Sequence, residues 1–476
     1  MNITDPIREH AQRTPGQVAY VGQPNRMQVS YAALDRLIDA AALRVLEAGV
    51  RPGQTAIVGL NEVFPYIVTM LALARIGVAA GATSLPDRFA DVRLVSAATT
   101  GSTLREVVAS PDWFAIGAAT PPAARPPSAQ GGAATWAIFG TSGTTGTPRH
   151  FAISHAMLAR RLAIAARTTP TPAAPRQLVR VGLRTSYGCL RLISVLSAGG
   201  LVAFPADREI ATSLRVRSIN MLVMAPADIA RFLRSLPADT PPFPALASVV
   251  MSGSVVPRPL YEEVRDRLCP NVVVNYGATE IGPIAGGALS DLIETPGCVG
   301  YVDKECEVQC VDEDDGPVAP GSSGIVRVRR NPDSGAYIDD PEASARTFRG
   351  DWFYPGDVGL ITHDGRLVIL GRQDEMVNVG GDKLSPRVIE ERVRALGNVV
   401  DAAAFTVPNA SGIPEVWVAV VPGPALDVAA FATRCAEAKA VPFGTRFLSV
   451  PELPRNPAGK VLRDDLVRMV VARRGG

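Results

Sequence analysis

A glycine- and hydroxyl-rich segment follows the apolar run Trp136-Ala-Ile-Phe139 and reads Gly-Thr-Ser-Gly-Thr-Thr-Gly-Thr-Pro-Arg149. Glycines let the backbone approach a phosphate closely, and successive N–H groups and hydroxyls can surround its oxygens. Arg149 adds a cation at the end of the segment. The Gly-Lys-Ser/Thr of phosphate loops and the Gly-x-Gly-x-x-Gly of dinucleotide-binding proteins are both absent. The position after a predicted strand favours phosphate binding over the alternative, a flexible linker.

Three further segments carry groups that bind metal, sugar or phosphate. Glu280, beside Thr279 at the exit of a predicted strand, can hold Mg²⁺ on a triphosphate, because hard cations prefer oxygen ligands. Asp357 can accept two sugar hydroxyls, and the guanidinium of Arg372 can meet the same ribose or a phosphate. Lys460, on a Pro- and Gly-shaped loop, can act as a point charge towards a phosphate. Taken singly, each has an ordinary structural explanation.

Alternating helices and strands must position these groups. The apolar spacing of residues 30–50 predicts a helix, with Ser30 as its N-cap and Gly49 as its stop. A strand at 55–60 and a helix at 66–75 follow. This alternation is typical of a parallel sheet covered by helices. Further buried strands are predicted at 201–204, 221–224, 248–251 and 272–274.

The C-terminal third has a different pattern. From about 299 to 370, short β-like pieces separated by Gly, Asp and Pro predict a β subdomain, and residues 388–476 return to helices and strands. The predicted fold is therefore α/β: a large N-terminal domain of mixed and parallel sheets with helices plus a β subdomain, and a small mobile α+β C-terminal domain. The predicted domains are 1–373 and 374–476.

Composition excludes several classes of partner. The 476 residues include 48 Lys+Arg and 46 Asp+Glu, and a net charge of +2 gives no electrostatic case for a nucleic-acid binder or a polybasic membrane protein. Six cysteines without a Cys-x-x-Cys pair favour a reducing, cytoplasmic compartment. The start lacks the pattern of a secretory signal, and the most apolar stretch, 66–85, is interrupted by Arg75 and several glycines. We therefore expect no nucleic-acid and no membrane partner.

Together and in this order, the chemical segments resemble the adenylate-forming superfamily: acyl- and aryl-CoA synthetases, adenylation domains and firefly luciferase. The resemblance covers almost the whole chain. One such match is weak, whereas five in register are strong. The five most specific pieces are Thr141–Pro148, Tyr276–Glu280, Gly356-Asp357, Gly371-Arg372-x-Asp374 and Pro457–Lys460.

The resemblance implies roles for individual residues. The hydroxyl-rich segment from Thr141 would grip the β- and γ-phosphates of ATP, and the strip ending in Ser254 and Val255 would border adenine. Asp357 would hold the ribose, and Lys460 would bridge the substrate carboxylate and the α-phosphate. The predicted catalytic residues are Lys460, Glu280 and Thr141, with Glu280 also serving Mg²⁺. The predicted nucleotide-binding residues are Thr141, Ser142, Gly143, Thr144, Thr145, Gly146, Arg149, Ser254, Val255, Asn275, Tyr276, Gly277, Thr279, Glu280, Asp357, Arg372 and Lys460.

Other implied residues concern the acid, the hinge and the thiol. Asp374 matches the hinge about which the C-terminal domain would rotate between half-reactions. Gly380, Gly381 and Lys383 match the loop presented for the second half-reaction. The predicted acid pocket consists of Thr185, Tyr187, Met251, Gly277 and Ile281. The chain departs from the usual pattern where Arg149-His150 replaces Lys-Gly, and where Thr185 stands in place of an aromatic residue or His.

The resemblance implies an AMP-forming acid–thiol ligase that uses ATP, Mg²⁺ and CoA. It would convert a small carboxylic acid, aryl or otherwise largely apolar, to an acyl-adenylate and then to a thioester. Amino-acid activation is disfavoured because residues 183–195 contain no Asp for the α-ammonium. Two alternatives stay open: an enzyme that loads a separate carrier protein or an amine, and a non-catalytic ATP or AMP sensor. Retention of Lys460, Asp357 and Glu280 argues against the sensor.

Overall fold

A computed structural model of the chain describes residues 2–23, 27–99, 102–116, 126, 131–141, 148–169, 171–329, 335–373, 377–379, 382–409, 414–455 and 461–474. The contacts within it define two compact units. The first comprises 1–294, 300–307 and 329–353, and the second comprises 295–299, 308–328 and 354–476. Asp374, at the predicted domain boundary, lies outside the described residues, so this boundary stays a prediction.

One sheet of the first unit has six strands in the order β6-β5-β3-β4-β7-β8. Neighbouring strands are parallel except for the antiparallel hairpin of β7 and β8. Short apolar strands such as β3 are buried on both faces, as parallel sheets covered by helices require. The strands are β3 (Thr55–Val58), β4 (Ala79–Gly81), β5 (Val92–Val95), β6 (Arg105–Val108), β7 (Thr135–Thr141) and β8 (Arg149–Ser154).

A second sheet of the same unit runs in the order β2-β1-β10-β9-β11-β12-β13-β14. Strands β10, β11 and β12 are buried at every position, and they have the predicted bounds because a continuous apolar run marks such a strand. β13 runs beyond its predicted end to Ala278 and pairs antiparallel with β14, which pairs in turn with β15. The strands are β1 (Val18–Gly22), β2 (Met27–Ser30), β9 (Arg176–Val179), β10 (Leu201–Phe204), β11 (Met221–Met224), β12 (Ser248–Met251), β13 (Val272–Ala278), β14 (Gly282–Ala288) and β15 (Cys298–Val302).

The helices of this unit begin and end at recognisable signals. The Ser30 hydroxyl accepts a hydrogen bond from the Ala33 N–H at 3.2 Å and caps α2, as predicted, and Gly49 turns the chain after it with a φ of +82°. α3 begins three residues before its predicted start. The helices are α1 (Asp5–Arg13), α2 (Tyr31–Glu47), α3 (Val63–Arg75), α4 (His155–Thr168), α5 (Ser186–Ser197), α6 (Ile210–Val216), α7 (Pro226–Ser235) and α8 (Arg258–Arg267).

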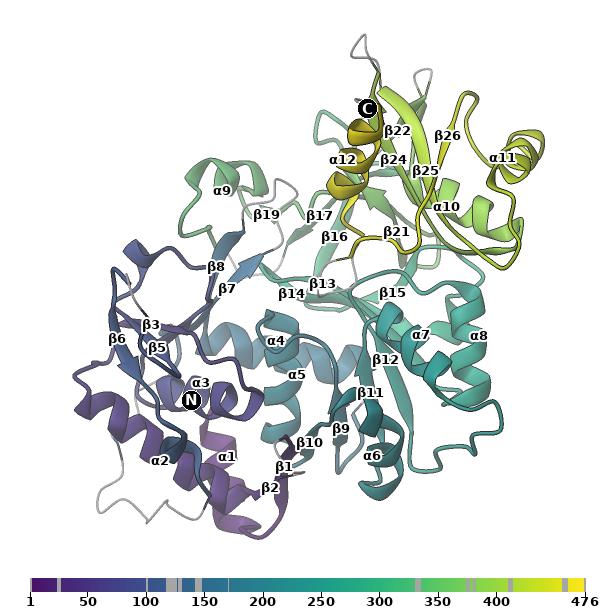
Figure 1. Cartoon of the computed structure of the whole chain (residues 1–476). Helices are drawn as coiled ribbons and strands as arrows, with labels where there is room; N and C mark the ends of the chain where they lie inside the picture. The colour runs from purple at the N-terminus through teal and green to yellow at the C-terminus, as the bar shows by residue number, and fades with distance from the viewer. Residues whose placement is uncertain are drawn as a thin grey trace. The chain divides into compact units, whose positions relative to one another are not determined.

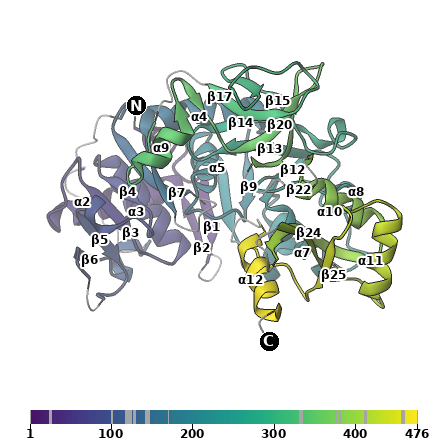
Figure 2. The same ribbon diagram turned by 90° about the horizontal axis from the view of Figure 1, so that it is seen from above.

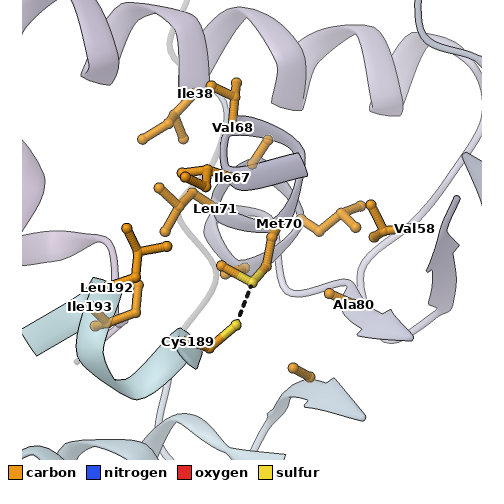
Figure 3. Packing of buried hydrophobic residues seen from close by; sticks show 14 of the residues in the cluster. Ile38, Val58, Ile67, Val68, Met70, Leu71, Ala80, Cys189, Leu192 and Ile193 are labelled. Carbon is orange, nitrogen blue, oxygen red and sulfur yellow. Dashed lines mark hydrogen bonds between the residues drawn. The ribbon is translucent and has the colours of Figure 1, made fainter. Parts of the chain in front are cut away.

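Helix α3 lies at the centre of the largest hydrophobic core. It packs against β3, β4 and β7 of the six-stranded sheet, while α5 packs against β9 and β10 of the other sheet. Figure 3 shows side chains of α3, including Met70, facing Cys189 and Leu192 of α5, with Val58 and Ala80 on the other side. The Cys189 thiol lies 3.5 Å from the Met70 sulfur. Apolar contact between these two helices thus joins the layers that carry the two sheets.

His155 at the first position of α4 is buried and neutral. Its Nδ1 accepts a hydrogen bond from the Ile3 N–H at 3.2 Å, which requires an unprotonated nitrogen. Burial lowers the pKa of His155 from 6.5 to about 4. Above pH 6.5 the ring is neutral in both the folded and the unfolded chain. Between pH 6.5 and 4 only the unfolded chain takes up the proton, so the free energy of unfolding falls as the pH falls.

We therefore expect the His155 ring to make the free energy of unfolding about 2 kcal/mol lower at pH 5 than at pH 7. Urea titrations at the two pH values, followed by tryptophan fluorescence, measure this difference. Other groups titrate in the same range, so the His155→Gln variant is the control. Its pH dependence should be shallower than that of the parent chain, and an equal pH dependence in both would contradict the assignment.

In the second unit, a three-stranded sheet carries helices on both faces. Alternate residues of β24 point to opposite sides: Ala402 and Ala404 join a core with α10 and α11, and Ala403 and Phe405 join a core with α12. Figures 1 and 2 show α12 on one side of this sheet and α11 on the other. The elements are α10 (Pro386–Ala395), β24 (Val399–Pro408), β25 (Pro414–Pro422), α11 (Val428–Glu437), β26 (Arg446–Ser449) and α12 (Arg463–Arg474).

The region predicted as a β subdomain, 299–370, is mostly strands but also contains a helix. α9 (Pro341–Thr347) is capped by Asp340, whose carboxylate accepts a hydrogen bond from the Ala343 N–H at 2.8 Å. An Asp-Pro-Glu start is a helix signal that the all-β interpretation overlooked. The strands of this region and the hairpin that follows are β16 (Glu307–Val311), β17 (Gly324–Arg329), β18 (Phe348–Arg349), β19 (Trp352–Phe353), β20 (Asp357–Ile361), β21 (Arg366–Arg372), β22 (Val377–Val379) and β23 (Asp382–Leu384).

Among the described helices, none has the length and apolarity needed to cross a bilayer.

Candidate active site

The β7–β8 hairpin holds the two ends of the predicted phosphate-binding segment. Thr141, the last residue of β7, is the cross-strand partner of Arg149, the first residue of β8. The strand leading to this point is anchored by Trp136 and Phe139, which are buried in the main core. Residues 142–147 lie outside the described part of the chain, so phosphate contacts of five predicted residues stay predictions. These are Ser142, Gly143, Thr144, Thr145 and Gly146.

Arg149 is held by acidic and aromatic partners. Its Nε lies 3.2 Å from a carboxylate oxygen of Asp340, and its guanidinium lies over the Tyr337 ring, 5.6 Å from the ring centroid. The Ala343 N–H and Arg149 both lower the pKa of the Asp340 carboxyl. The cation is therefore oriented before any ligand arrives, although its contact with phosphate stays a prediction.

A hydrogen-bonded chain of three side chains lies at the turn end of the hairpin, beside the second residue of β8. The Ser84 hydroxyl lies 3.0 Å from Nε2 of His150, and Nδ1 of His150 contacts the Asp339 carboxylate. The other Asp339 oxygen accepts a hydrogen bond from the His150 N–H at 3.1 Å. In the tautomer whose Nδ1 proton faces the Asp339 carboxylate, Nε2 is the acceptor for the Ser84 hydroxyl. This chain ties β8 to the loop after β4 and to the segment that carries Asp339.

Sequence reasoning missed Ser84 and Asp339. The one available signal was His150 itself, which stands where glycine is usual. Space at this point is limited, because a Cβ added at Gly140, the cross-strand partner of His150, would lie 2.9 Å from the Ser84 hydroxyl. The three side chains therefore fill the room beside the hairpin and fix its position.

Glu280, the predicted Mg²⁺ ligand, is buried beside Tyr337. The Tyr337 hydroxyl donates a hydrogen bond to Oε1 of Glu280 at 2.7 Å. Glu280 is 7% exposed, and both burial and the adjacent carboxylate raise the pKa of Tyr337. The tyrosine thus stays a hydrogen-bond donor that orients the carboxylate. Sequence reasoning did not identify Tyr337.

One carboxylate is a suitable protein contribution to a Mg²⁺ site on a nucleotide. Mg²⁺ is commonly held by one or two carboxylates together with substrate phosphates and water. The described residues contain no cluster of three or more His, Cys, Asp or Glu side chains of the kind that forms an all-protein metal site. Glu280 therefore fits an ion that arrives with ATP, and this ion would neutralise phosphate charge.

The first turn of α5 meets the end of β13. The Ser186 hydroxyl donates to the Thr279 hydroxyl at 3.2 Å, and the Asn275 amide donates to the Tyr187 hydroxyl at 3.4 Å. The Thr169 hydroxyl donates to the Asn275 side-chain oxygen at 2.8 Å. The structure thus brings predicted nucleotide residues and the predicted pocket residue Tyr187 together at the carboxyl ends of the parallel strands, where ligands bind in open α/β sheets.

Arg161 on α4 fixes the turn between β13 and β14. Its guanidinium donates to the carbonyl oxygens of Thr279 and Glu280, at 2.8 Å each. Arg161 is 2% exposed, and a Cβ added at Gly282 would lie 2.8 Å from the Arg161 stem. This residue is a positioning residue that the sequence reasoning did not identify, because nothing in helix spacing indicates its partners.

The remaining predicted pocket residues lie near these groups along the chain, and their role as a pocket stays a prediction. Thr185 caps α5 by accepting a hydrogen bond from the Gly188 N–H at 3.1 Å. Met251 and Ile281 are buried, at 1% and 2% exposure. A Cβ at Gly277 would lie 2.4 Å from the Gly282 carbonyl oxygen, so this position requires glycine. The predicted adenine residues Ser254 and Val255 are exposed on the loop after β12, and Tyr276 lies on β13.

Asp357 and Arg372 form the predicted ribose pair in the second unit. They are cross-strand partners on β20 and β21, and their side chains lie 3.3 Å apart. Arg372 also donates to the Pro355 carbonyl oxygen. Gly356 has a φ of +79°, and a Cβ there would lie 2.7 Å from the guanidinium, so glycine allows the close approach. The pair is thus held by the strand register and by the turn before it.

Several predicted residues cannot be placed. Asp374, Gly380, Gly381 and Lys460 lie outside the described residues, and for Lys383 only the backbone, within β23, is described. Their roles as hinge, thiol-side loop and catalytic lysine stay predictions.

Comparison with known proteins identifies the family. Residues 90–332 match the family model described as AMP-binding enzyme. The chain is 31% identical over 351 residues to the indoleacetate–CoA ligase of Aromatoleum aromaticum, a match that covers 70% of this chain and 67% of that protein. The chain belongs to the AMP-binding enzyme family, and the predicted membership of the adenylate-forming superfamily is confirmed.

Solved structures confirm the predicted fold class. The o-succinylbenzoate CoA synthetase of Bacillus subtilis, in complex with an acyl-adenylate intermediate, superposes with a TM-score of 0.81 at 21% identity and covers 97% of both chains. The amide bond synthetase McbA of Marinactinospora thermotolerans gives a TM-score of 0.82 at 21% identity, with 98% of this chain and 99% of that chain covered.

Proposed function

We propose that the chain is an AMP-forming ligase that activates a small carboxylic acid with ATP and transfers the acyl group to CoA. The observation that carries this proposal is the family match over 90–332, which includes the Thr141–Arg149 hairpin and the buried Glu280. The named CoA ligase among its relatives supports an aryl or other largely apolar acid and CoA as acceptor. A cytoplasmic location stays a prediction.

The proposed first step is a displacement at phosphorus. A carboxylate oxygen of the acid attacks the α-phosphorus of ATP, the bond from that phosphorus to the bridging oxygen breaks, and pyrophosphate leaves. No general base is needed, because the carboxylate is already ionised. The protein would contribute alignment and charge: the segment from Thr141 would hold the phosphates, Thr279 would serve the α-phosphate, and Glu280 would hold Mg²⁺.

The proposed second step transfers the acyl group. The thiolate of CoA attacks the carbonyl carbon, the bond between that carbon and the AMP oxygen breaks, and AMP leaves. A rotation about Asp374 would exchange Lys460 for the loop of Gly380, Gly381 and Lys383 between the steps. A separate carrier protein or an amine are the alternative acceptors.

ATP–pyrophosphate exchange with a panel of carboxylic acids tests the proposal. Exchange that depends on a particular acid is the expected result, and CoA, carrier protein and hydroxylamine supplied separately would then identify the acceptor. Absence of exchange with every acid would favour the nucleotide sensor over the ligase.

We further expect Asp357→Ala to weaken ATP binding by about 100-fold, because the carboxylate is proposed to accept hydrogen bonds from two ribose hydroxyls. The ratio of kcat/KM for ATP to that for 2′-deoxy-ATP is the informative measurement. This ratio should shrink towards one in the variant. Damage to folding alone would lower both values and leave their ratio unchanged, and that outcome would contradict a ribose contact.

A further inference from the structure

Three arginines in the described part of the first unit are almost fully buried, and their partners differ. Arg75 is 0% exposed and faces two carboxylates, Asp35 at 2.8 Å and Asp39 at 2.7 Å. Arg161 donates to two backbone carbonyls at the β13–β14 turn. Arg191, on α5, is 1% exposed and has neither kind of partner for its guanidinium in the described part of the chain.

The guanidinium of Arg191 is held by two weakly compensating groups. Its Nε donates to the side-chain oxygen of Gln177 at 3.1 Å. Its Nη2 contacts the same oxygen and lies 2.8 Å from the Met221 sulfur. An amide carries no net charge, and a thioether is a weak acceptor. Within the described residues, no carboxylate lies within 4 Å of the group. Burial lowers the pKa of Arg191.

A buried cation without an anion is costly, and proteins normally pair such groups or let a ligand supply the charge. Gln177 is 0% exposed and holds the guanidinium from the β9 side of the contact with α5. The pair of polar side chains thus occupies positions that would otherwise take apolar residues. The arrangement preserves a positive charge inside the protein at a cost in stability.

The position of Arg191 relates it to the proposed acid pocket. Arg191 and Tyr187 are four residues apart on α5 and therefore share one face, with a rise of about 6 Å between them. Tyr187 packs on a cluster that includes Met221, which is also a partner of Arg191. The N-terminal end of α5 contacts Thr279 through Ser186, the residue before Tyr187. From the N-terminal end of α5, Ser186 comes first, beside the predicted nucleotide residue Thr279. Tyr187 follows, and Arg191 lies one turn further along the helix.

We propose that Arg191 binds a second anionic group at the far end of the acid substrate. The inference rests on the proposed function, and it narrows the substrate class to an aryl or alkyl acid with a second carboxylate roughly one helical turn beyond the apolar segment. The carboxylate at Thr279 is activated, and the second one supplies the charge that Arg191 lacks. An acid with an apolar far end leaves the cation unpaired and is a poor substrate.

Matched acids test this assignment in the full-length protein. We expect ATP–pyrophosphate exchange to favour terephthalate over benzoate and adipate over hexanoate, since each pair differs in a terminal carboxylate. Arg191→Met should lower kcat/KM for the diacids by about 100-fold and leave the monoacids unchanged or improved. Arg191→Lys, which keeps the charge, should retain part of the preference. Equal use of both acids by the parent chain, or an unchanged preference in Arg191→Met, would overturn the proposal.

Thermal unfolding provides a second readout that separates this inference from the proposed function. Arg75→Met should lower the unfolding midpoint because it strands two buried carboxylates, whereas Arg191→Met should leave the midpoint unchanged or raise it. Terephthalate or adipate should raise the midpoint of the parent chain and not that of Arg191→Met. If no acid supports exchange, the proposed function fails. The change in unfolding midpoint with diacid would still show whether Arg191 binds a second carboxylate. A diacid that stabilises neither protein, or both equally, would contradict the site.

Discussion

Glu280→Gln is expected to lower the rate of acyl-adenylate formation by about 100- to 1,000-fold. The substitution keeps the size of the side chain and an oxygen that can accept the Tyr337 hydrogen bond, but removes the negative charge. Removal of a preorganised electrostatic group at a reacting phosphate has effects of this size. ATP–pyrophosphate exchange measured over a series of Mg²⁺ concentrations reports the loss, and the variant should also require more Mg²⁺ for half-maximal rate.

Tyr337→Phe is the matched control for this variant. It removes the hydroxyl that orients Glu280 and leaves the carboxylate charge, so we expect a loss of about 10-fold or less. The two variants together separate charge from orientation. If Glu280→Gln were as active as the parent chain while Tyr337→Phe was impaired, Glu280 would be a structural partner of the tyrosine and not a ligand for Mg²⁺.

Lys460→Ala is expected to lower adenylation by about 1,000-fold and to leave thioester formation nearly intact. The proposed lysine contacts both the acid carboxylate and the α-phosphate, so its charge matters most when these two anionic groups approach each other. The second half-reaction would proceed after a rotation that withdraws this lysine. Exchange measures the first step, and thioester release from pre-made acyl-adenylate and CoA measures the second.

The comparison of the two steps makes the Lys460 prediction specific. Lys460→Arg keeps the charge on a bulkier group and should recover part of the first step, because arginine places its donors differently. An equal loss in both half-reactions would contradict the rotation, since a lysine needed in both steps cannot be withdrawn between them.

The fold was predictable wherever local sequence alone determines an element. The strands at 201–204, 221–224 and 248–251 have the predicted bounds because each is an apolar run buried on both faces. Ser30 caps α2 because a serine before an apolar helical pattern can satisfy a free N–H. The helix α9 was missed, although Asp340-Pro341 marks its start, because the surrounding residues carry a β-like pattern.

The site was predictable where a motif is contiguous and not where partners are distant in sequence. Thr279 and Glu280 stand in one motif, whereas Tyr337 reaches Glu280 from 57 residues away. The contact between Ser84 and His150 spans 66 residues, and tertiary packing alone brings the two side chains together. Arg191 resembles an ordinary helix cation in the sequence, and its burial without a carboxylate becomes visible only after α5 has packed against β9.

Transfer of an oxygen isotope from the acid to AMP is the decisive test of acyl-adenylate formation. The acid that supports the fastest exchange would be labelled with ¹⁸O in its carboxylate and incubated with ATP, Mg²⁺ and CoA. Attack of that carboxylate on the α-phosphorus places one labelled oxygen in the bridge, and thiol attack on the carbonyl carbon then leaves it on AMP. We expect AMP to be heavier by one ¹⁸O per thioester formed. Unlabelled AMP, or release of ADP and phosphate in place of AMP and pyrophosphate, would contradict it.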